Sequence, residues 1–581
     1  MEQTWLGRVH HRAVLLLLLC FCGGTASRAD IPAEPIRLSV PLVGSSLDAD
    51  VLFVRPNADG SVALLLTAAS NLVGSDRNGK SDVFVVDVES LLAERVSISF
   101  LGRDPNDGSF PGVLTDDGSI AVFGSAANNL VTGDFNRTPD LFLFDRNSRR
   151  TSILTLANDG LGGGTVPDLP PAVSPEGRWI AFASQSDDFV ANDRNEASDV
   201  FVLDRESGTI TAMTLTRLGA TEVRTANGPS AGPAISTDGC IVAFFSDASN
   251  LVERDRNEAR DVFVRDRCND TIERVSVASN GAEANGPSQI ELATLALSGD
   301  GRFVAFSSRA TNLDGDTGRR SQIFVRDRFL GTTRLVSRSP TGDIANAPSV
   351  SPSLDREGRF LVFQSAATNL SPDDVWPGED VFVVDLTDGE LHLISRPSAG
   401  GEADGDSYAP SISADGSRIV FLSRARLSPV DTDTRVDAYI TANPMFGKPP
   451  GGLTPTPETP PSPTPSSTAT LSPSATLEPT ATVTPTPTFT ETATPPPTAT
   501  PTLHVDATST PEAPAVGTAT ATATATTTVP TPVPSRPAGG SGDGCGCRID
   551  PETGQLTGSP ISPWALLPMA WVLWSRRFRK Q

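Results

Sequence analysis

The chain has 581 residues and a formal net charge of −23, because 69 Asp and Glu outnumber 46 Lys and Arg. A phosphate-rich partner is bound through clustered Lys and Arg, so this composition argues against a nucleic-acid-binding protein. Of the four His, His10 and His11 lie near the N-terminus, His504 lies in a Thr/Pro-rich stretch, and only His392 remains elsewhere. A Ser-His-Asp triad or a His-built zinc site therefore has almost no residues to draw on.

The N-terminus has the pattern of a secretory signal peptide. Arg8 and Arg12 precede the apolar run 13–19, and small residues within 25–29 offer a cleavage site. The apolar run is too short for a membrane-spanning helix. We therefore interpret residues 1–29 as a signal peptide and expect the mature protein to be exported.

One phrase then recurs seven times along the chain. It consists of an acidic residue and Gly, an apolar run, a polar stretch, an Asp-x-Asn loop, and a run such as Asp-Val-Phe-Val that ends in Asp. The period is about 60 residues, which indicates supersecondary units packed side by side rather than one irregular fold. The seven copies begin at Asp59, Asp117, Glu176, Asp238, Asp300, Glu357 and Asp415.

Each repeat is predicted to contain four short strands. In the copy that begins at Asp238 these are 232–236, 240–245, 261–266 and 271–277, rich in β-branched and aromatic residues and separated by Gly, Asn and Asp. The central runs are apolar on both faces, as expected when each sheet packs between two neighbours. Four-stranded blades arranged around an axis meet that requirement.

The two ends of the repeat region predict a closed ring. Residues 35–40 match the fourth strand of later units, whereas the seventh unit stops after its third strand at 436–440. An N-terminal strand that completes the last blade would remove an exposed sheet edge. The prediction is an all-β fold, a seven-bladed β-propeller over residues 30–447 in which the N-terminal strand closes the last blade.

The repeated Asp-Gly-Arg-(aromatic)-Val-Ala-Phe and Asp-Val-Phe-Val-x-Asp-Arg phrases resemble the TolB-like, WD40-like β-propeller repeats of bacterial envelope proteins. The resemblance covers about residues 36–442. It implies the propeller fold but no particular ligand, because that family is functionally broad.

Two Cys within the repeats are placed to form a disulfide. Cys240 begins the second strand of its unit and Cys268 follows the third, and such positions lie side by side in an antiparallel pair. The equivalent positions of the preceding unit are Arg178 and Glu206, whose opposite charges also suit cross-strand neighbours. An oxidising compartment would preserve the bond. The alternative is a pair of buried free thiols.

Four acidic loops between second and third strands are calcium candidates. Carboxylate and amide oxygens at alternating positions suit this hard cation, although the Gly and distal Glu of an EF-hand loop are absent. The alternative is structural, because Asp and Asn also close turns by bonding to their own backbone. The candidate ligands are Asp76, Asn78, Asp82, Asp134, Asn136, Asp140, Asp193, Asn195, Asp199, Asp255, Asn257 and Asp261.

Two further residue types recur on the third strand of each repeat. The aromatic residues are predicted to form the core between blades, and the Asp residues at the strand ends are predicted to bond to backbone or to pair with Arg. The aromatic set is Phe84, Phe142, Phe201, Phe263, Phe324, Phe382 and Tyr439, and the Asp set is Asp87, Asp145, Asp204, Asp266, Asp327 and Asp385.

Beyond the repeats the composition changes. Residues 448–538 are roughly half Thr or Pro over most of their length, which predicts a disordered, extended stalk. Residues 539–581 contain Cys545-Gly546-Cys547, a short apolar run at 561–574 and a basic end. This order resembles a bacterial surface-sorting tail, and its Cys-Gly-Cys element resembles the MYXO-CTERM type, which implies processing at Cys545 or Cys547 and anchoring at the cell surface. The alternative is a short transmembrane segment that is retained as a tail anchor.

These observations favour an exported, surface-anchored, non-catalytic module that binds a protein or a polysaccharide and has no certain cofactor apart from possible calcium. The rival hypothesis is a carboxylate-dependent glycan hydrolase or lyase at the central channel, which requires two or three acidic groups with perturbed pKa values converging there. The acidic residues that differ most from the repeat pattern are Asp373 and Asp374, which lie next to Trp376 in the sixth unit.

Overall fold

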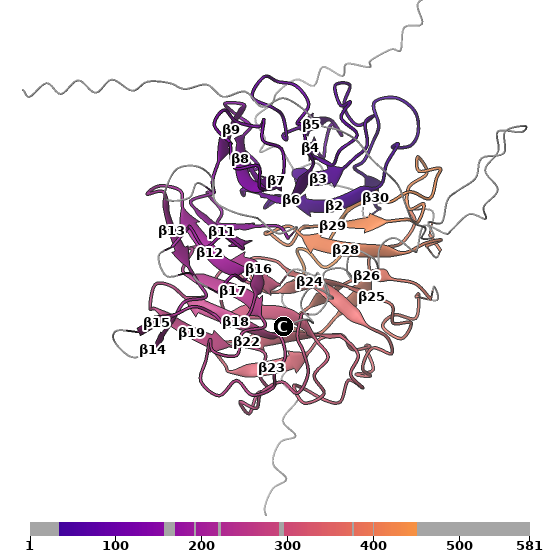
Figure 1. The fold of residues 1–581 in the computed structure, drawn as a ribbon. Coiled ribbons are helices and arrows are strands. Elements are labelled where there is room, and N and C mark those ends of the chain that lie inside the picture. Colours follow the sequence, from indigo (N-terminus) through magenta and orange to yellow (C-terminus); the bar gives the residue numbers. More distant parts are fainter. Residues whose placement is uncertain are drawn as a thin grey trace, which may run out of the picture. The chain divides into compact units, whose positions relative to one another are not determined.

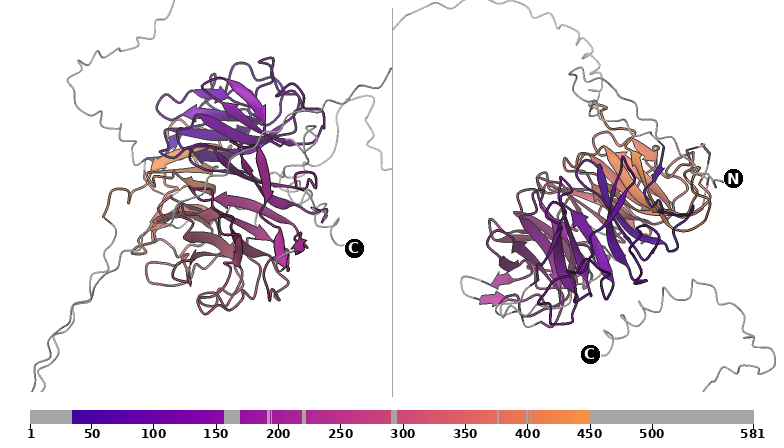
Figure 2. Two further views of the ribbon diagram at one scale, coloured as in Figure 1. Left: turned by 90° about the vertical axis from the view of Figure 1, so that its left-hand side faces the viewer. Right: turned by 90° about the horizontal axis from the view of Figure 1, so that it is seen from above.

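The computed structural model describes residues 34–155, 169–190, 193, 195–218, 222–289, 295–374, 377–398, 400–401 and 403–449. Within these residues every regular element is a β-strand, and the strands form seven four-stranded sheets and one two-stranded sheet. The four-stranded sheets follow one another around a central axis as blades (Figures 1 and 2). The fold is therefore a seven-bladed β-propeller, as the repeats predict.

In each blade the first strand lies innermost and the fourth lies at the rim. Blade one contains β2 (Val51–Pro56), β3 (Val62–Thr67), β4 (Asp82–Asp87) and β5 (Ala93–Arg95); blade two contains β6 (Ser109–Leu114), β7 (Ile120–Ser125), β8 (Asp140–Asp145) and β9 (Arg150–Ile153). Blade three contains β10 (Ala172–Val173), β11 (Trp179–Ser184), β12 (Asp199–Asp204) and β13 (Thr209–Ala212), and is followed by the hairpin β14 (Thr216–Leu218) and β15 (Glu222–Arg224). Blade four contains β16 (Ser230–Ile235), β17 (Ile241–Ser246), β18 (Asp261–Asp266) and β19 (Thr271–Arg274); blade five contains β20 (Ala296–Leu297), β21 (Phe303–Ser308), β22 (Gln322–Asp327) and β23 (Thr332–Leu335). Blade six contains β24 (Ser349–Leu354), β25 (Phe360–Ser365), β26 (Asp380–Asp385) and β27 (Leu391–Leu393); blade seven contains β28 (Ser407–Ile412), β29 (Arg418–Ser423), β30 (Asp437–Ala442) and β1 (Ile36–Arg37).

The predicted strand boundaries shift slightly in blade four. The innermost strand begins at Ser230 and has a register shift between Ala231 and Ala234. The rim strand ends at Arg274, earlier than the predicted end at residue 277, because Ser276 turns back to bond Asp261. Both differences arise from irregular pairing that an apolar pattern does not report.

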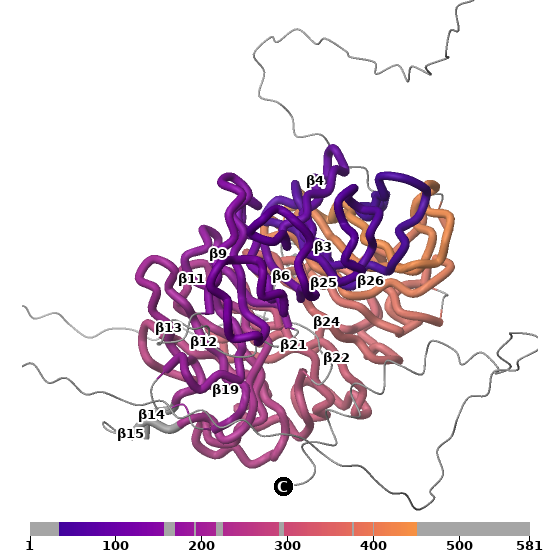
Figure 3. Tube along the Cα trace, turned by 45° about the horizontal axis from the view of Figure 1, so that its top comes forward, coloured from indigo at the N-terminus to yellow at the C-terminus, as the bar shows by residue number. Residues whose placement is uncertain are grey.

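The ring closes through the N-terminal strand, as predicted. β1 pairs antiparallel with β30, with Ile36 opposite Ile440, so the sheet order of blade seven is β1-β30-β29-β28. The Oγ of Ser39 donates a hydrogen bond of 2.5 Å to Asp437 Oδ1, and a guanidinium nitrogen of Arg37 lies 2.9 Å from the same oxygen. In Figure 3 the orange blade seven therefore lies beside the indigo blade one.

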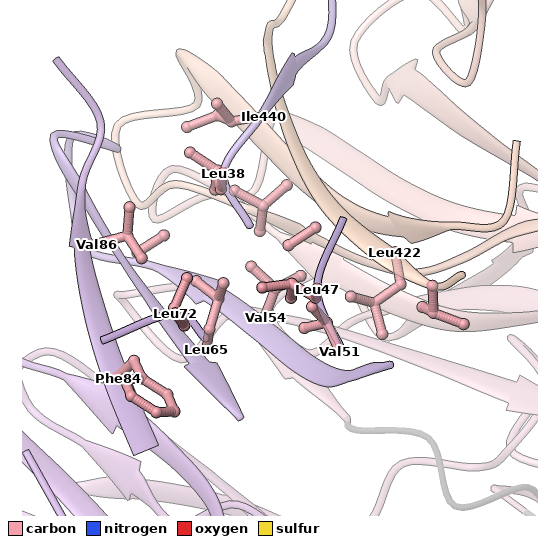
Figure 4. Close-up of a cluster of buried hydrophobic side chains, with 14 of the residues drawn as sticks. Leu38, Leu47, Val51, Val54, Leu65, Leu72, Phe84, Val86, Leu422 and Ile440 are labelled. Atoms are coloured by element: carbon pink, nitrogen blue, oxygen red, sulfur yellow. The ribbon is translucent and has the colours of Figure 1, made fainter. Parts of the chain in front are cut away.

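The apolar core lies between blades. Between blades one and seven, for example, Phe84 and Leu65 belong to the same buried cluster as Leu422 and Ile440, with Leu38 beside them (Figure 4). The predicted third-strand aromatic residues are all fully buried. In six blades a second-strand Phe faces them, with ring centroids 5.7–6.3 Å apart as in the pairs Phe363–Phe382 and Phe123–Phe142. The assignment of these aromatics to the core is confirmed.

The acidic-Gly turns and the strand-end Asp residues are structural. Gly239 has φ +73°, and a Cβ there would lie 2.2 Å from Cδ1 of Trp179 in the preceding blade, so glycine is required both by conformation and by packing. Asp266 at the end of β18 accepts backbone N–H bonds from Cys268 and Asn269. Its equivalents do the same, and some also pair with Arg, as Asp385 pairs with Arg359 at 2.8 Å. The predicted role of these Asp residues is confirmed.

The structure joins Cys240 and Cys268 by a disulfide between residues whose Cα atoms lie 5.3 Å apart. In blade three the equivalent residues, Arg178 and Glu206, form an ion pair of 2.9 Å. The two positions are therefore cross-strand neighbours in both blades.

The remaining predicted segments lie outside the described residues. These are the signal peptide 1–29, the stalk beyond residue 449, and the tail 539–581 with Cys545 and Cys547. Within the described part of the chain, no helical segment has the length and apolarity that crossing a membrane requires.

Replacing both Cys240 and Cys268 by Ala is expected to lower the free energy of unfolding by about 3 kcal/mol, because the bond closes a loop in the unfolded chain. The two Cys are 28 residues apart. Urea denaturation of the purified protein measures the change, and reductant should reproduce it in the wild type while leaving the double variant unaffected. Equal stability of the oxidised protein and the double variant would contradict the expectation.

Substituting Ser39→Ala is expected to destabilise the protein by about 1–3 kcal/mol, because it leaves a buried oxygen of Asp437 without its hydroxyl donor. Ser207→Ala removes a hydroxyl that bonds Thr209 on the exposed surface, and serves as the control. Its effect should stay within about 0.5 kcal/mol. Similar urea midpoints for the two variants would argue against a structural role of the closing bond.

Candidate functional site

The ring has two ends that are formed by different loops. The loop face carries the loops between second and third strands together with those between fourth strands and the next blade; Asn257 Nδ2, for example, donates to the backbone oxygen of Ala284 at 3.0 Å. The turn face carries the acidic-Gly turns. All the predicted calcium ligands belong to the loop face, and the cavity described below lies toward the turn face.

At the loop face the same buried bond is made in all seven blades. A Ser or Thr hydroxyl just beyond the fourth strand donates to the first residue of the third strand, as Ser97 does to Asp82 and Thr155 to Asp140, both at 2.6 Å. In blade five the acceptor is the amide oxygen of Gln322. The second Asp of each predicted calcium loop therefore has a structural bond of its own. The seven bonds are Ser39–Asp437, Ser97–Asp82, Thr155–Asp140, Thr214–Asp199, Ser276–Asp261, Ser337–Gln322 and Ser395–Asp380.

The Asn side chains of the four loops close turns. Asn136 Oδ1 accepts the backbone N–H of Thr138 at 3.1 Å, while its Nδ2 donates to Asp140 Oδ2 at 3.0 Å. The corresponding bonds of Asn78, Asn195 and Asn257 are the same. Each Asn thus turns its N–H donors, and not its carbonyl oxygen, toward the second carboxylate of its loop.

In blades one and four a guanidinium lies between the two carboxylates. Nη1 of Arg95 is 3.3 Å from Asp76 Oδ1 and 3.5 Å from Asp82 Oδ2, and all three side chains are buried. In blade four Arg274 Nη1 lies 3.1 Å from Asp255 and 3.3 Å from Asp261. These two predicted calcium loops therefore already contain an internal cation.

Blades two and three keep the carboxylates but lack the guanidinium. Strand pairing places Arg95 opposite Phe84, and places Ile153 opposite Phe142 in blade two. Ala212 takes the same position in blade three, opposite Phe201. Among the described residues no cation pairs with Asp134, Asp140, Asp193 or Asp199.

Burial raises the pKa of these carboxyl groups. It raises the pKa of Asp140 to about 6, and the charge of Asp134 adds to the effect. The pKa of Asp193 is likewise raised to about 6 by burial and by Asp199. A buried pair of carboxylates holds a proton more tightly because ionising both places like charges side by side.

The remaining blades depart from the loop pattern. Blade five has Gln322 in place of the second Asp, and in blade seven Arg37 faces Asp437. In blade six the buried Asp374, six residues before Asp380, takes the first carboxylate position of the loop, and the exposed Asp373 beside it pairs with Arg396 at 2.8 Å. Trp376 lies outside the described residues. The acidic pair 373–374 therefore gains no support from the structure as a catalytic site.

Toward the turn face the blades are linked by backbone bonds between successive turns. Ala58 donates to Asp116 O, Asp116 to Pro175 O, Thr237 to Gly299 O, Gly299 to Arg356 O, Arg356 to Ala414 O, and Asp415 to Ala58 O, at 2.8–3.3 Å. Pro175 has no N–H, so it cannot donate the corresponding bond to blade four. These turns narrow the central channel.

A cavity of about 210 Å³ lies in the channel beside these turns. It is lined by the ends of the innermost strands, and three of the described lining residues are ionisable: Arg55, Asp116 and Arg356. Nη2 of Arg356 in blade six lies 2.6 Å from both carboxylate oxygens of Asp116 in blade two. The single lining carboxylate is therefore neutralised across the channel.

Arg55 distinguishes blade one from the other blades at the cavity. It stands four residues before the acidic residue of its turn, and the six equivalent residues of the other blades also line the cavity. Burial lowers the pKa of Arg55 to about 10, and no described residue pairs with it or bonds its guanidinium. Among the described residues of the cavity, the positive charge of Arg55 therefore has no counter-charge. The six equivalents are small or apolar: Val113, Ala172, Ala234, Ala296, Ser353 and Ser411.

The fold and the cavity define a closed β-propeller whose central channel contains an unpaired guanidinium. No protein-family model and no curated protein matches the chain. Among solved structures, an oligogalacturonate lyase from Vibrio parahaemolyticus is 12% identical, with 70% of this chain and 93% of that chain covered at a TM-score of 0.43. TolB from Acinetobacter baumannii is 15% identical, with 63% and 66% covered at a TM-score of 0.31. The β-propeller domain of the Trilobed protease from Pyrococcus furiosus is 8% identical, with 68% and 95% covered at a TM-score of 0.41.

Sequence reasoning missed both groups of arginines, although the repeats contain the signal for each. Aligning the units shows Arg-Val-Ser at Arg95 and Arg274 where the second and third units have Ile153 and Ala212. The same alignment shows Arg55 as the one charged residue at its position. The sequence pattern predicts equivalent calcium ligands in four blades. The structure separates these blades by whether the position of Arg95 and Arg274 holds an arginine.

The protein is expected to be more stable near pH 5 than near pH 7.5 in the presence of a chelator. Burial raises the folded-state pKa of six carboxyl groups to about 6: Asp82, Asp140, Asp193, Asp255, Asp355 and Asp437. The native state then binds more protons than the unfolded state between about pH 4 and pH 6, so stability falls as the pH rises through that window. Carboxyl groups whose pKa is lowered in the folded state lose their contribution to stability only below this pH window. Thermal midpoints measure the trend, which Asp140→Asn should weaken; a midpoint that rises toward pH 7.5 would contradict it.

Proposed function

We propose that this chain is an exported, non-catalytic β-propeller that binds an anionic group of a protein or polysaccharide partner in its central channel. The observation that carries this proposal is Arg55, whose guanidinium lines the cavity without a counter-charge among the described residues. A partly buried guanidinium without a counter-charge is unfavourable, and a carboxylate or sulfate would compensate it through charge-assisted hydrogen bonds.

The composition of the cavity supports binding over catalysis. A carboxylate-dependent hydrolase or lyase requires a pair of acidic groups or a free base near the reacting atoms. Among the described lining residues Asp116 is the one acidic residue, and Arg356 engages both of its oxygens. The same part of the lining contains no His, Tyr or Cys.

Export and surface anchoring belong to the same proposal. They are supported by the basic and apolar N-terminus, by the Cys-Gly-Cys tail at residues 545–547, and by the Cys240–Cys268 disulfide, which an oxidising compartment would maintain. Anchoring would place the membrane among the partners of the tail, while the negative net charge disfavours nucleic acid.

The binding proposal is tested with uronic-acid oligosaccharides and neutral oligosaccharides of matched length, together with an acidic and a neutral peptide, by isothermal titration calorimetry. We expect one acidic series to bind and Arg55→Gln to weaken it by about 10–100-fold, the range of a lost hydrogen bond to a charged group. Arg77→Gln makes the same change at an exposed residue of the loop face and should leave the affinity unchanged.

Two results would overturn the proposal. Equal affinity of Arg55→Gln and the wild type would remove the channel as the binding site. Formation of unsaturated oligosaccharide products on incubation with the wild type would show lyase chemistry and reverse the non-catalytic assignment.

A further inference from the structure

On the loop face of blades one to four, two carboxylates six residues apart flank a common position. The first carboxylate precedes the third strand and the second begins it. In blades one and four this position holds a guanidinium nitrogen, within 3.1–3.5 Å of both carboxylates. The third neighbour of each guanidinium is also acidic: Asp104 lies 2.7 Å from Arg95, and Glu283 lies 2.6 Å from Arg274. The position is therefore built for a cation.

Blades two and three lack that internal cation because Ile153 and Ala212 replace the arginine. Both side chains are much shorter than Arg and carry no charge. The carboxylates nevertheless remain buried: Asp134 is 8% exposed and Asp193 is 7% exposed. Uncompensated buried carboxylates are strongly unfavourable in a protein interior.

The first carboxylate of each loop has buried oxygens without a hydrogen-bond partner: both oxygens of Asp76, Oδ1 of Asp134 and Oδ1 of Asp193. Asp76 has the guanidinium of Arg95 3.3 Å away, whereas no described cation pairs with Asp134 or Asp193. Their loop partners are satisfied by contrast, since Asp140 accepts bonds from Thr155 and Asn136, and Asp199 accepts bonds from Thr214 and Asn195. The first carboxylate of each loop thus presents an oxygen with nothing bound to it.

We propose that blades two and three each bind one hard divalent cation, with Ca²⁺ the best candidate, between Asp134 and Asp140 and between Asp193 and Asp199. The cation takes the position that Arg95 and Arg274 occupy in blades one and four. The available ligands are oxygens, which Ca²⁺ prefers, and water completes its coordination. Asp76, Asp82, Asp255 and Asp261, the other carboxylates predicted as ligands, are excluded because a guanidinium already occupies the position between them.

The test is calcium binding by the full-length protein near pH 7.5 after chelator treatment, followed by calorimetric titration with CaCl₂ and by thermal midpoint. The wild type is expected to bind two Ca²⁺ and to gain several degrees in midpoint, since a ligand that binds only the native state stabilises it. Ile153→Arg should lower the stoichiometry to one by supplying the guanidinium of blade one, and the double variant with Ala212→Arg should bind none. Ile153→Leu is the matched control and should still bind two.

A second variant keeps the test informative if the arginine variants fold poorly. Asp134→Asn preserves size and removes only the charge of the unpartnered carboxylate, so its stoichiometry should fall from two to one. Absence of Ca²⁺ binding by the folded wild type would show that the carboxylate pairs hold protons and would overturn the proposal. A stoichiometry that stays unchanged in both Ile153→Arg and Asp134→Asn would place the cation elsewhere and would also overturn it.

Discussion

The ring depends on a buried bond between a hydroxyl beyond the fourth strand and the first side chain of the third strand. In six blades this bond joins residues close in sequence, as Ser276 and Asp261 are joined. In blade seven the same bond, from Ser39 to Asp437, links residues 398 positions apart. The closure of the ring is thus one more copy of the interaction that organises every blade. Because the N-terminal strand completes the last sheet, no blade is left with an unpaired third strand.

Repetition also explains where the two candidate sites arise. Most polar side chains of the repeat bond to equivalent neighbours in each blade. A ligand site can arise where one blade lacks a charged residue that other blades have, or has one that they lack. Blades two and three lack the arginine that lies between the loop-face carboxylates of blades one and four, whereas blade one has Arg55 at a channel position where the other blades have small or apolar residues. A charge without its partner costs free energy in the native state, which a cation or an anionic ligand would recover.

The two ends of the ring consequently differ in electrostatic character. The loop face concentrates carboxylates, some paired internally with Arg95 or Arg274. Among the described residues that line the cavity near the turn face, Asp116 is engaged by Arg356 and Arg55 is left without a counter-charge. An anionic partner would therefore meet the channel and not the carboxylate loops, and cations on the loop face would act on stability independently of that partner.

The number of blades, the strand order, the closure and the aromatic core could all be predicted from the sequence by itself. Each rests on a repeated pattern whose meaning is local: an acidic-Gly turn, an apolar run, or an orphan strand such as 35–40. Only the tertiary structure decided which of the predicted carboxylates have a cation beside them. Arg95 belongs to a different strand from Asp76 and Asp82, and the partner of Asp116 is 240 residues away. The charge that a buried group can sustain depends on neighbours brought together in space, so neither the division among the acidic loops nor the isolation of Arg55 could be obtained from the individual motifs.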